Sequence, residues 1–181
     1  MSRNNSIMVD LIRIASLLPA MTLAACSTYP PVHTVAQLDL ERFMGDWYVI
    51  ANIPTFIERR AHNAIESYRL EDDGSIATTF TFRDGSFDGE EKVYRPRGFV
   101  IDTDSNALWG MQFIWPFKGD YRVIHIDEDY TTTVIGREKR DYVWLMARTP
   151  NPSSEAYNEA LEVIRSAGYD MSELQTVPQE W

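Results

Sequence analysis

Cysteine is almost absent from this chain of 181 residues, whose single thiol is Cys26. One cysteine excludes an intrachain disulfide framework and any zinc site that needs several thiolates. Histidine is scarce too, with three residues, so we expect no metal centre built on imidazole. Basic residues are also in the minority, because 17 Lys and Arg stand against 27 Asp and Glu and leave a formal charge of −10. Since the phosphates of nucleic acid attract a basic surface, we expect no nucleic-acid partner.

A long hydrophobic run is missing as well. The mainly apolar stretch at residues 14–25 has 12 residues, whereas a membrane-spanning helix needs about 20. The chain as a whole is nevertheless 44% hydrophobic and 12% aromatic, which is too apolar for a disordered protein. The composition and length therefore predict one globular domain with a short appendage.

The N-terminal stretch has the layout of a secretory signal peptide. Arg3 and Arg13 precede the apolar run, and small residues end it. Asp10 interrupts the early part of the stretch, so a translation start at Met8 rather than Met1 stays open.

The end of that run, Leu23-Ala24-Ala25-Cys26, resembles a bacterial lipobox, in which cleavage precedes a cysteine that carries a diacylglyceryl group. The resemblance implies a lipoprotein signal peptide over residues 1–25 and lipidation at Cys26. An ordinary signal peptide or a buried thiol is the alternative. In lipoproteins of this kind, an Asp directly after the lipidated cysteine favours retention in the inner membrane. This chain has Ser27 at that position, so the resemblance implies an anchor in the outer membrane, at its periplasmic face.

Residues 26–37 contain prolines and polar residues and are interpreted as a lipidated tether, followed by a domain over residues 38–181. Turn signals rich in Gly, Asp and Asn recur about every ten residues in this domain. No helical pattern separates the β-type runs, which favours an antiparallel meander that closes as an eight-stranded up-and-down barrel. The predicted strands are 45–53, 64–70, 76–83, 91–101, 107–115, 121–126, 131–137 and 142–148. An amphipathic helix, predicted to begin at Asn151-Pro152 and to end at Gly168, should pack outside the barrel.

The opening of the first strand, Gly45-Asp46-Trp47-Tyr48, resembles the lipocalin signature. Two further blocks agree with that family: Asp129-Tyr130 between the sixth and seventh strands, and Arg148 at the end of the eighth. Connections in such a barrel alternate between its two ends, so these blocks should meet at one end. We interpret them as structural, with Trp47 as an apolar plug, Arg148 stacked on its indole, and Gly45 allowing close backbone approach.

At the opposite, open end, Arg59, Arg60 and His62 form a small basic cluster in an otherwise acidic chain. They are candidates to bind an anionic headgroup, or they belong to a solvated loop. Trp115-Pro116-Phe117 is an apolar loop tip at the same end. It suits contact with a membrane, a ligand tail or a second subunit, or simple packing over the opening.

An eight-stranded barrel has room for one small ligand. With Trp47 facing inward, the alternation of side chains places Val49 and Ala51 inward too. His125 is interpreted as an interior or surface histidine rather than a catalytic or haem-ligating one. The remaining candidates for the cavity wall are Trp109, Met111, Tyr121, Val123, His125, Trp144 and Met146.

The resemblance is greatest to bacterial outer-membrane lipocalins of the Blc type, through the signature, the lipobox, residues 141–145 and residues 147–150. It implies a non-enzymatic protein without a cofactor that stores or transports fatty acids or lysophospholipids for membrane maintenance under stress, and a capacity to form a homodimer. A carrier of another hydrophobic molecule, such as a pigment, haem or siderophore, is the first alternative. A lipocalin-type enzyme is the second, although the chain's one thiol lies outside the predicted barrel and no catalytic grouping is evident.

Overall fold

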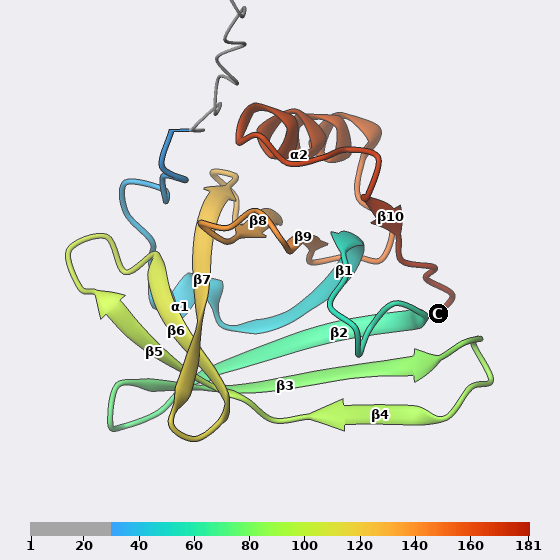
Figure 1. Cartoon of the computed structure of the whole chain (residues 1–181), viewed down its shortest axis with the longest axis horizontal. Coiled ribbons are helices and arrows are strands. Elements are labelled where there is room, and N and C mark those ends of the chain that lie inside the picture. The colour runs from blue at the N-terminus through green and yellow to red at the C-terminus, as the bar shows by residue number, and fades with distance from the viewer. Residues whose placement is uncertain (1–29) are drawn as a thin grey trace, which may run out of the picture.

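An antiparallel sheet that closes on itself forms most of the protein (Figure 1). The computed structural model describes residues 30–181. Its barrel strands neighbour one another in chain order, and the last pairs with the first to complete the ring. They are β1 (Gly45–Ile53), β2 (Ala61–Leu70), β3 (Ser75–Asp84), β5 (Arg97–Asp102), β6 (Leu108–Ile114), β7 (Phe117–Ile126), β8 (Thr132–Gly136) and β9 (Val143–Ala147). The predicted eight-stranded up-and-down barrel is confirmed.

Two strands lie outside this ring order, and one hairpin is longer than predicted. The run predicted as one strand over 91–101 is divided into β4 (Glu91–Tyr94) and β5, because Pro96 has no N–H to donate to a ladder. Both segments pair with β3. The loop predicted at residues 115–120 is mostly strand, since β7 begins at Phe117. Finally, β10 (Gln175–Thr176) adds to the edge of β1.

One end of the barrel is closed by a short helix, α1 (Leu40–Phe43). Its first turn is capped by Asp39, whose carboxylate accepts a hydrogen bond from the backbone N–H of Arg42 at 3.1 Å. The helix thereby directs Phe43, which is fully buried, into the barrel interior.

The second helix, α2 (Ser154–Ser166), packs on the outside of the barrel (Figure 1). It begins after Ser153, whose hydroxyl caps the backbone N–H of Ala156, and not at the predicted Asn151 cap. Its buried residues Ala160 and Ile164 contact an outer apolar cluster that includes Leu145 of β9. The predicted external helix is confirmed, and residues 30–181 form one core inside the barrel and another under α2.

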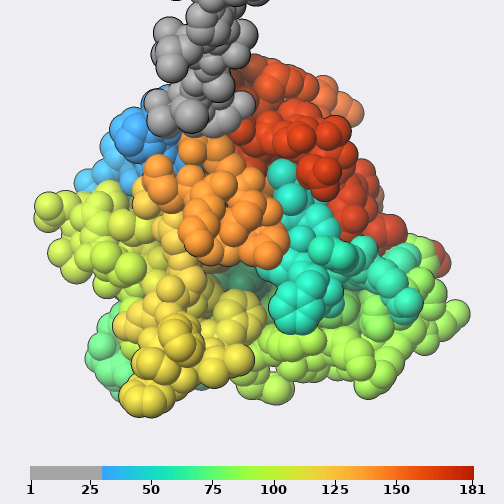
Figure 2. Space-filling view, in the orientation of Figure 1, coloured from blue at the N-terminus to red at the C-terminus, as the bar shows by residue number. Residues whose placement is uncertain are grey.

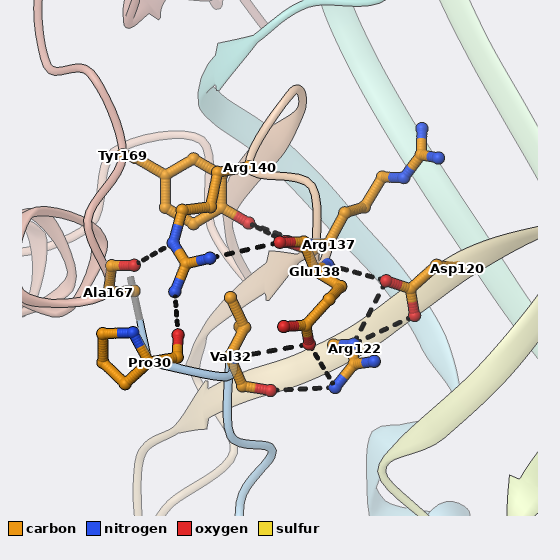
Figure 3. Close-up of polar contacts among 9 residues, drawn as sticks. All are labelled: Pro30, Val32, Asp120, Arg122, Arg137, Glu138, Arg140, Ala167 and Tyr169. Carbon is orange, nitrogen blue, oxygen red and sulfur yellow. Dashed lines mark hydrogen bonds and ion pairs between the residues drawn. The ribbon is translucent and has the colours of Figure 1, made fainter. Parts of the chain in front are cut away.

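The described part of the N-terminal segment, from Pro30, lies along the barrel (Figure 3). Arg122 of β7 donates to the carbonyl of Val32 at 2.9 Å and forms an ion pair with Glu138 at 3.0 Å. Arg140, between β8 and β9, donates to the carbonyl of Pro30. Residues 30–37 are therefore bonded to the barrel, while the division of the chain into signal peptide, tether and domain stays a prediction.

Candidate functional site

The closed end of the barrel is organised around one guanidinium. Arg148 donates to the backbone carbonyls of Arg42 and Met44, both at 2.8 Å, and of Asp46 at 2.9 Å. It also bonds to the carbonyls of Phe43 and Tyr130. The planar fork of an arginine suits this set of acceptors, which a lysine could not serve at once.

The residues of the predicted signature meet at this guanidinium. The Arg148 guanidinium carbon lies 3.8 Å from the centre of the Trp47 ring, and the Trp47 indole donates to the carbonyl of Phe43 at 2.8 Å. Gly45 has a φ of +95°, and a Cβ there would lie 3.3 Å from the Arg148 side chain. Tyr130 lies under Arg42 in a further cation–π contact of 4.1 Å. Asp129 lies exposed at the turn, so the structure brings together the other four predicted residues but not this one.

The barrel contains a cavity of about 440 Å³ towards the opposite end. This volume lies within the usual range for small-molecule sites, roughly 300–1,000 Å³. Figure 2 shows a recess between the β1–β2 connection (teal), the β6–β7 hairpin (yellow) and the β8–β9 connection (orange). The wall is mainly apolar and aromatic but contains four charged residues. The lining residues are Thr55, Ile57, Glu58, Glu66, Phe80, Met111, Phe113, Ile114, Phe117, Gly119, Asp120, Tyr121, Arg137 and Trp144.

Three of the predicted wall residues, Met111, Tyr121 and Trp144, line this cavity. Five others belong to the packed inner core between the cavity and the closed end, where the Trp109 and Tyr121 rings stack with their centres 5.3 Å apart. The five are Trp47, Val49, Trp109, Val123 and Met146. The cavity therefore occupies only the part of the barrel nearer the open end.

The prediction that Ala51 faces the barrel interior is wrong. The pairing of β1 with β9 shifts between Val49 and Ala51, because Ile50 is an extra residue in a β-bulge. The bulge inverts the alternation of side chains, so Ala51 lies in the outer cluster beneath α2. Asn52 is instead the neighbour of Trp144 across the strand pair, and it is buried.

His125 is misplaced in the prediction for the same physical reason. The pairing of β7 with β8 shifts between Val123 and His125, with Ile124 as the extra residue. His125 is half-buried opposite Val134, a residue of the outer cluster, and Ile126 packs on the inner core in its place. His125 does not line the cavity.

The predicted basic cluster lies beside the opening rather than in it. Arg59 and Arg60 are exposed, and the Arg60 side chain pairs with Asp84 at 3.2 Å. His62 is half-buried, with its Nδ1 3.0 Å from the carbonyl oxygen of Arg60 and its ring against Phe87. None of the three basic residues lines the cavity.

Two glutamates in the cavity wall were not anticipated from the sequence. Glu58, from the β1–β2 connection, is 2% exposed and accepts hydrogen bonds from the Thr55 backbone N–H at 2.9 Å and the Trp144 indole at 3.1 Å. Glu66, in the middle of β2, is 8% exposed and hydrogen-bonds to Tyr68. The sequence does not indicate that Glu66 is buried, because a charged residue next to Ile65 is typical of the solvent-facing position of a strand.

Burial shapes the protonation of these two groups. Burial raises the pKa of Glu66 to about 8, and the nearby charge of Glu58 adds to this rise. The hydrogen bond to Tyr68 acts in the opposite direction and lowers the pKa. Burial likewise raises the pKa of Glu58, against the hydrogen bonds that it accepts from Thr55 and Trp144. Glu66 is therefore mostly a neutral carboxylic acid at pH 7, able to donate as well as accept a hydrogen bond.

Apolar side chains surround the opening. Phe113, Ile114, Trp115 and Phe117 of the β6–β7 hairpin are all more than half exposed, as is Phe56 of the β1–β2 connection. In the described residues 30–181, no helix is long and apolar enough to cross a membrane. The same part of the chain contains no group of three or more His, Cys, Asp or Glu side chains placed to hold a metal ion.

Comparison with known proteins agrees with the barrel fold. A family model described as a lipocalin-like domain matches residues 38–179. The chain belongs to the lipocalin family. This lipocalin is 30% identical over 169 residues to the outer membrane lipoprotein Blc of Citrobacter freundii, covering 92% of this chain and 95% of that protein. It is 31% identical over 157 residues to temperature-induced lipocalin-1 of Arabidopsis thaliana, and the match covers 82% of this chain and 83% of that protein.

Solved structures show the same fold at low identity. Insecticyanin from the tobacco hornworm Manduca sexta superposes with a TM-score of 0.66 at 14% identity, covering 83% of the lipocalin described here and 85% of that chain. Apocrustacyanin C1 superposes with a TM-score of 0.64 at 9% identity, and the match covers 79% of this lipocalin and 81% of that chain. These likenesses support the barrel architecture and say nothing about the ligand.

Proposed function

We propose that this lipocalin is a membrane-anchored binding protein, not an enzyme, that stores or transports fatty acids or lysophospholipids in its barrel for membrane maintenance under stress. The observation that carries this proposal is the cavity of about 440 Å³, closed at one end and walled mainly by apolar side chains. Each CH₂ group that a ligand buries there contributes about 0.8 kcal/mol, so an acyl chain can bind without any catalytic chemistry.

The position of the cavity also suits loading from a membrane. The exposed apolar side chains of the β6–β7 hairpin and Phe56 lie around the opening. Pro30 is bonded to the β8–β9 connection at the same end, only four residues after Cys26. A lipid on Cys26 would therefore hold the opening close to the bilayer surface, at the periplasmic face of the outer membrane. The similarity to the outer membrane lipoproteins named Blc supports this location.

Filling the cavity should abolish binding. Gly119 lines the cavity on β7, and a Cβ there would meet only the Met111 carbonyl oxygen, at an ordinary 3.5 Å. We expect Gly119→Leu to weaken binding of a lysophospholipid at least tenfold, measured by titration of tryptophan fluorescence. Lys118→Leu, which places the same side chain next along the strand but over Phe99 outside the barrel, should bind as the parent does. Equal affinity of all three proteins would place the ligand elsewhere.

The anchor is tested separately, because Cys26 lies outside the described residues. We expect Cys26→Ala to move the protein from the membrane fraction to the soluble fraction, since the acyl chains supply the membrane affinity of a protein with net negative charge. The measurement is fractionation of cells that express each form, with Cys26→Ser as a second variant. Unchanged sedimentation of both variants with the membrane would overturn lipidation at Cys26.

A further inference from the structure

Within residues 30–181, the two glutamates in the cavity wall have no positively charged partner. Across residues 30–181, no Lys or Arg forms an ion pair with Glu58 or Glu66. The other charged lining residues are already paired, Asp120 with Arg122 at 3.0 Å and Arg137 with Asp141 at 3.5 Å. A buried carboxyl group without a cation is unfavourable in its ionised form, so a cation placed in the cavity would stabilise the ionised form of both groups.

The surroundings of the two carboxyl groups are aromatic. Trp144 donates its indole N–H to Glu58, and Tyr121 shares a short hydroxyl contact with Tyr68, the hydrogen-bond partner of Glu66. Several further rings line the cavity, namely Phe80, Phe113 and Phe117. Carboxylates combined with aromatic faces are the groups that bind ammonium ions, through charge attraction and cation–π contacts.

We propose that the cavity takes an apolar ligand that carries an ammonium group, as an amine or a quaternary ammonium, and that Glu58 and Glu66 bind this cation. The inference rests on the proposed function and narrows it, because it favours lysophospholipids and other ligands that carry an ammonium group over fatty acids. A ligand with a free carboxylate would bring a further negative charge towards two acids whose ionisation burial already opposes. A ligand without a polar group would leave both carboxyls against hydrocarbon, so neither alternative completes the site as an ammonium does.

The test compares two amphiphiles with the same alkyl chain, dodecyltrimethylammonium and dodecanoate, by isothermal titration of the purified full-length protein at pH 8.5. We expect the cation to bind at least tenfold more tightly. In Glu58→Gln and Glu66→Gln, which keep the shape of each side chain, the preference should fall to about threefold or less. A preference of twofold or less in the parent, or an unchanged preference in both variants, would overturn the inference.

Two controls separate the cavity from the acidic surface. Asp72→Asn removes one negative charge from an exposed turn at the other end of β2 and should leave the preference unchanged. Gly119→Leu should abolish binding of both amphiphiles. If the two amphiphiles bind the parent with equal affinity and Gly119→Leu abolishes the binding of both, the ammonium inference fails and the proposed function stands. If neither amphiphile binds the parent, both fail.

The preference should also increase between pH 6 and pH 9. A quaternary ammonium does not titrate, whereas the pKa of Glu66 is about 8, so the site gains negative charge over this range. Around the cavity the other titratable or charged groups are Glu58, Asp120 and Arg137, with the hydroxyls of Tyr68 and Tyr121 alongside. Burial raises the pKa of both tyrosines well above the usual value, so they stay neutral. A preference that declines over this range would contradict the assignment to Glu66.

The ammonium could belong to a zwitterionic lipid headgroup or to a free amine, and a second ligand pair distinguishes the two sources. Lysophosphatidylcholine carries a quaternary ammonium that lysophosphatidylglycerol lacks. Tighter binding of the choline lipid, lost in Glu58→Gln and Glu66→Gln, assigns the cation to a lipid. A preference confined to the simple amphiphiles assigns it to a free amine.

Discussion

Replacing Arg148 with alanine should lower the free energy of unfolding by about 3 kcal/mol, the largest effect that we expect from one substitution at the closed end. The guanidinium serves five backbone carbonyls and stacks on Trp47, and alanine leaves those carbonyls without their donor. Leaving a partly buried acceptor without its charged donor lowers the free energy of unfolding by roughly 1–3 kcal/mol, and water can replace part of the lost hydrogen bonding at this half-exposed site. The expected fall in Tm is about 6–12 °C, measured by thermal unfolding.

Two further variants make this result specific. Arg148→Lys keeps the positive charge but cannot reach the same set of carbonyls, so it should recover less than half of the lost stability. Arg69→Ala removes an arginine that is 76% exposed and pairs only with Glu71 in the described structure, so it should change the stability by less than about 0.5 kcal/mol. A Tm of Arg148→Ala within 2 °C of the parent would show that the cluster at the closed end is not structural.

The second large effect is the contribution of Glu66 to the pH dependence of stability, which Glu66→Gln removes. Glu66 has a pKa of about 8 in the folded protein against about 4.5 in the unfolded chain. Between these values Glu66 has released its proton in the unfolded chain but retains it in the folded protein, so its contribution to the stability falls as the pH rises. By pH 7 the loss relative to pH 4.5 is about 3 kcal/mol, and above pH 8 it levels off because the folded form ionises too.

Glutamine cannot ionise, so the stability of Glu66→Gln relative to the parent should increase by about 3 kcal/mol between pH 4.5 and pH 7. Denaturant unfolding of both proteins across this pH range measures the difference in their free energies of unfolding. The prediction concerns how this difference changes with pH, not its value at one pH. Glu159→Gln is the matched control, because this side chain is exposed on α2 and its replacement should have the same small effect at every pH. A constant difference between Glu66→Gln and the parent would contradict the burial of an uncompensated acid in the cavity.

The barrel itself could be predicted because its signals are local. Turn residues separate the strands, Pro152 and Gly168 flank the helix, and Gly45 with Trp47 marks the first strand. The interior was predicted less well, because a single extra residue changes which face a side chain occupies. The bulges at Ile50 and Ile124 carry no distinctive residue type, so the errors at Ala51 and His125 follow directly from them.

The acidic part of the site was missed for a different reason. A glutamate in a strand normally faces solvent, and Glu66 is flanked by Ile65, which is the better interior residue on hydrophobicity alone. Glu58 belongs to a connection, and only the folded structure shows that its carboxyl turns inward to Trp144. The sequence therefore predicts an apolar container, and the structure adds the acidic groups that give the container its expected selectivity.

Native mass spectrometry of the protein extracted from its own membrane shows whether the cavity holds a lipid. We expect a population whose mass exceeds that of the protein with its covalent anchor by one noncovalently bound acyl lipid, and we expect this population to be missing from Gly119→Leu prepared in the same way. A parent protein that has no bound lipid, and that also fails to take up added lysophospholipid, would contradict the claim that the cavity is a lipid site.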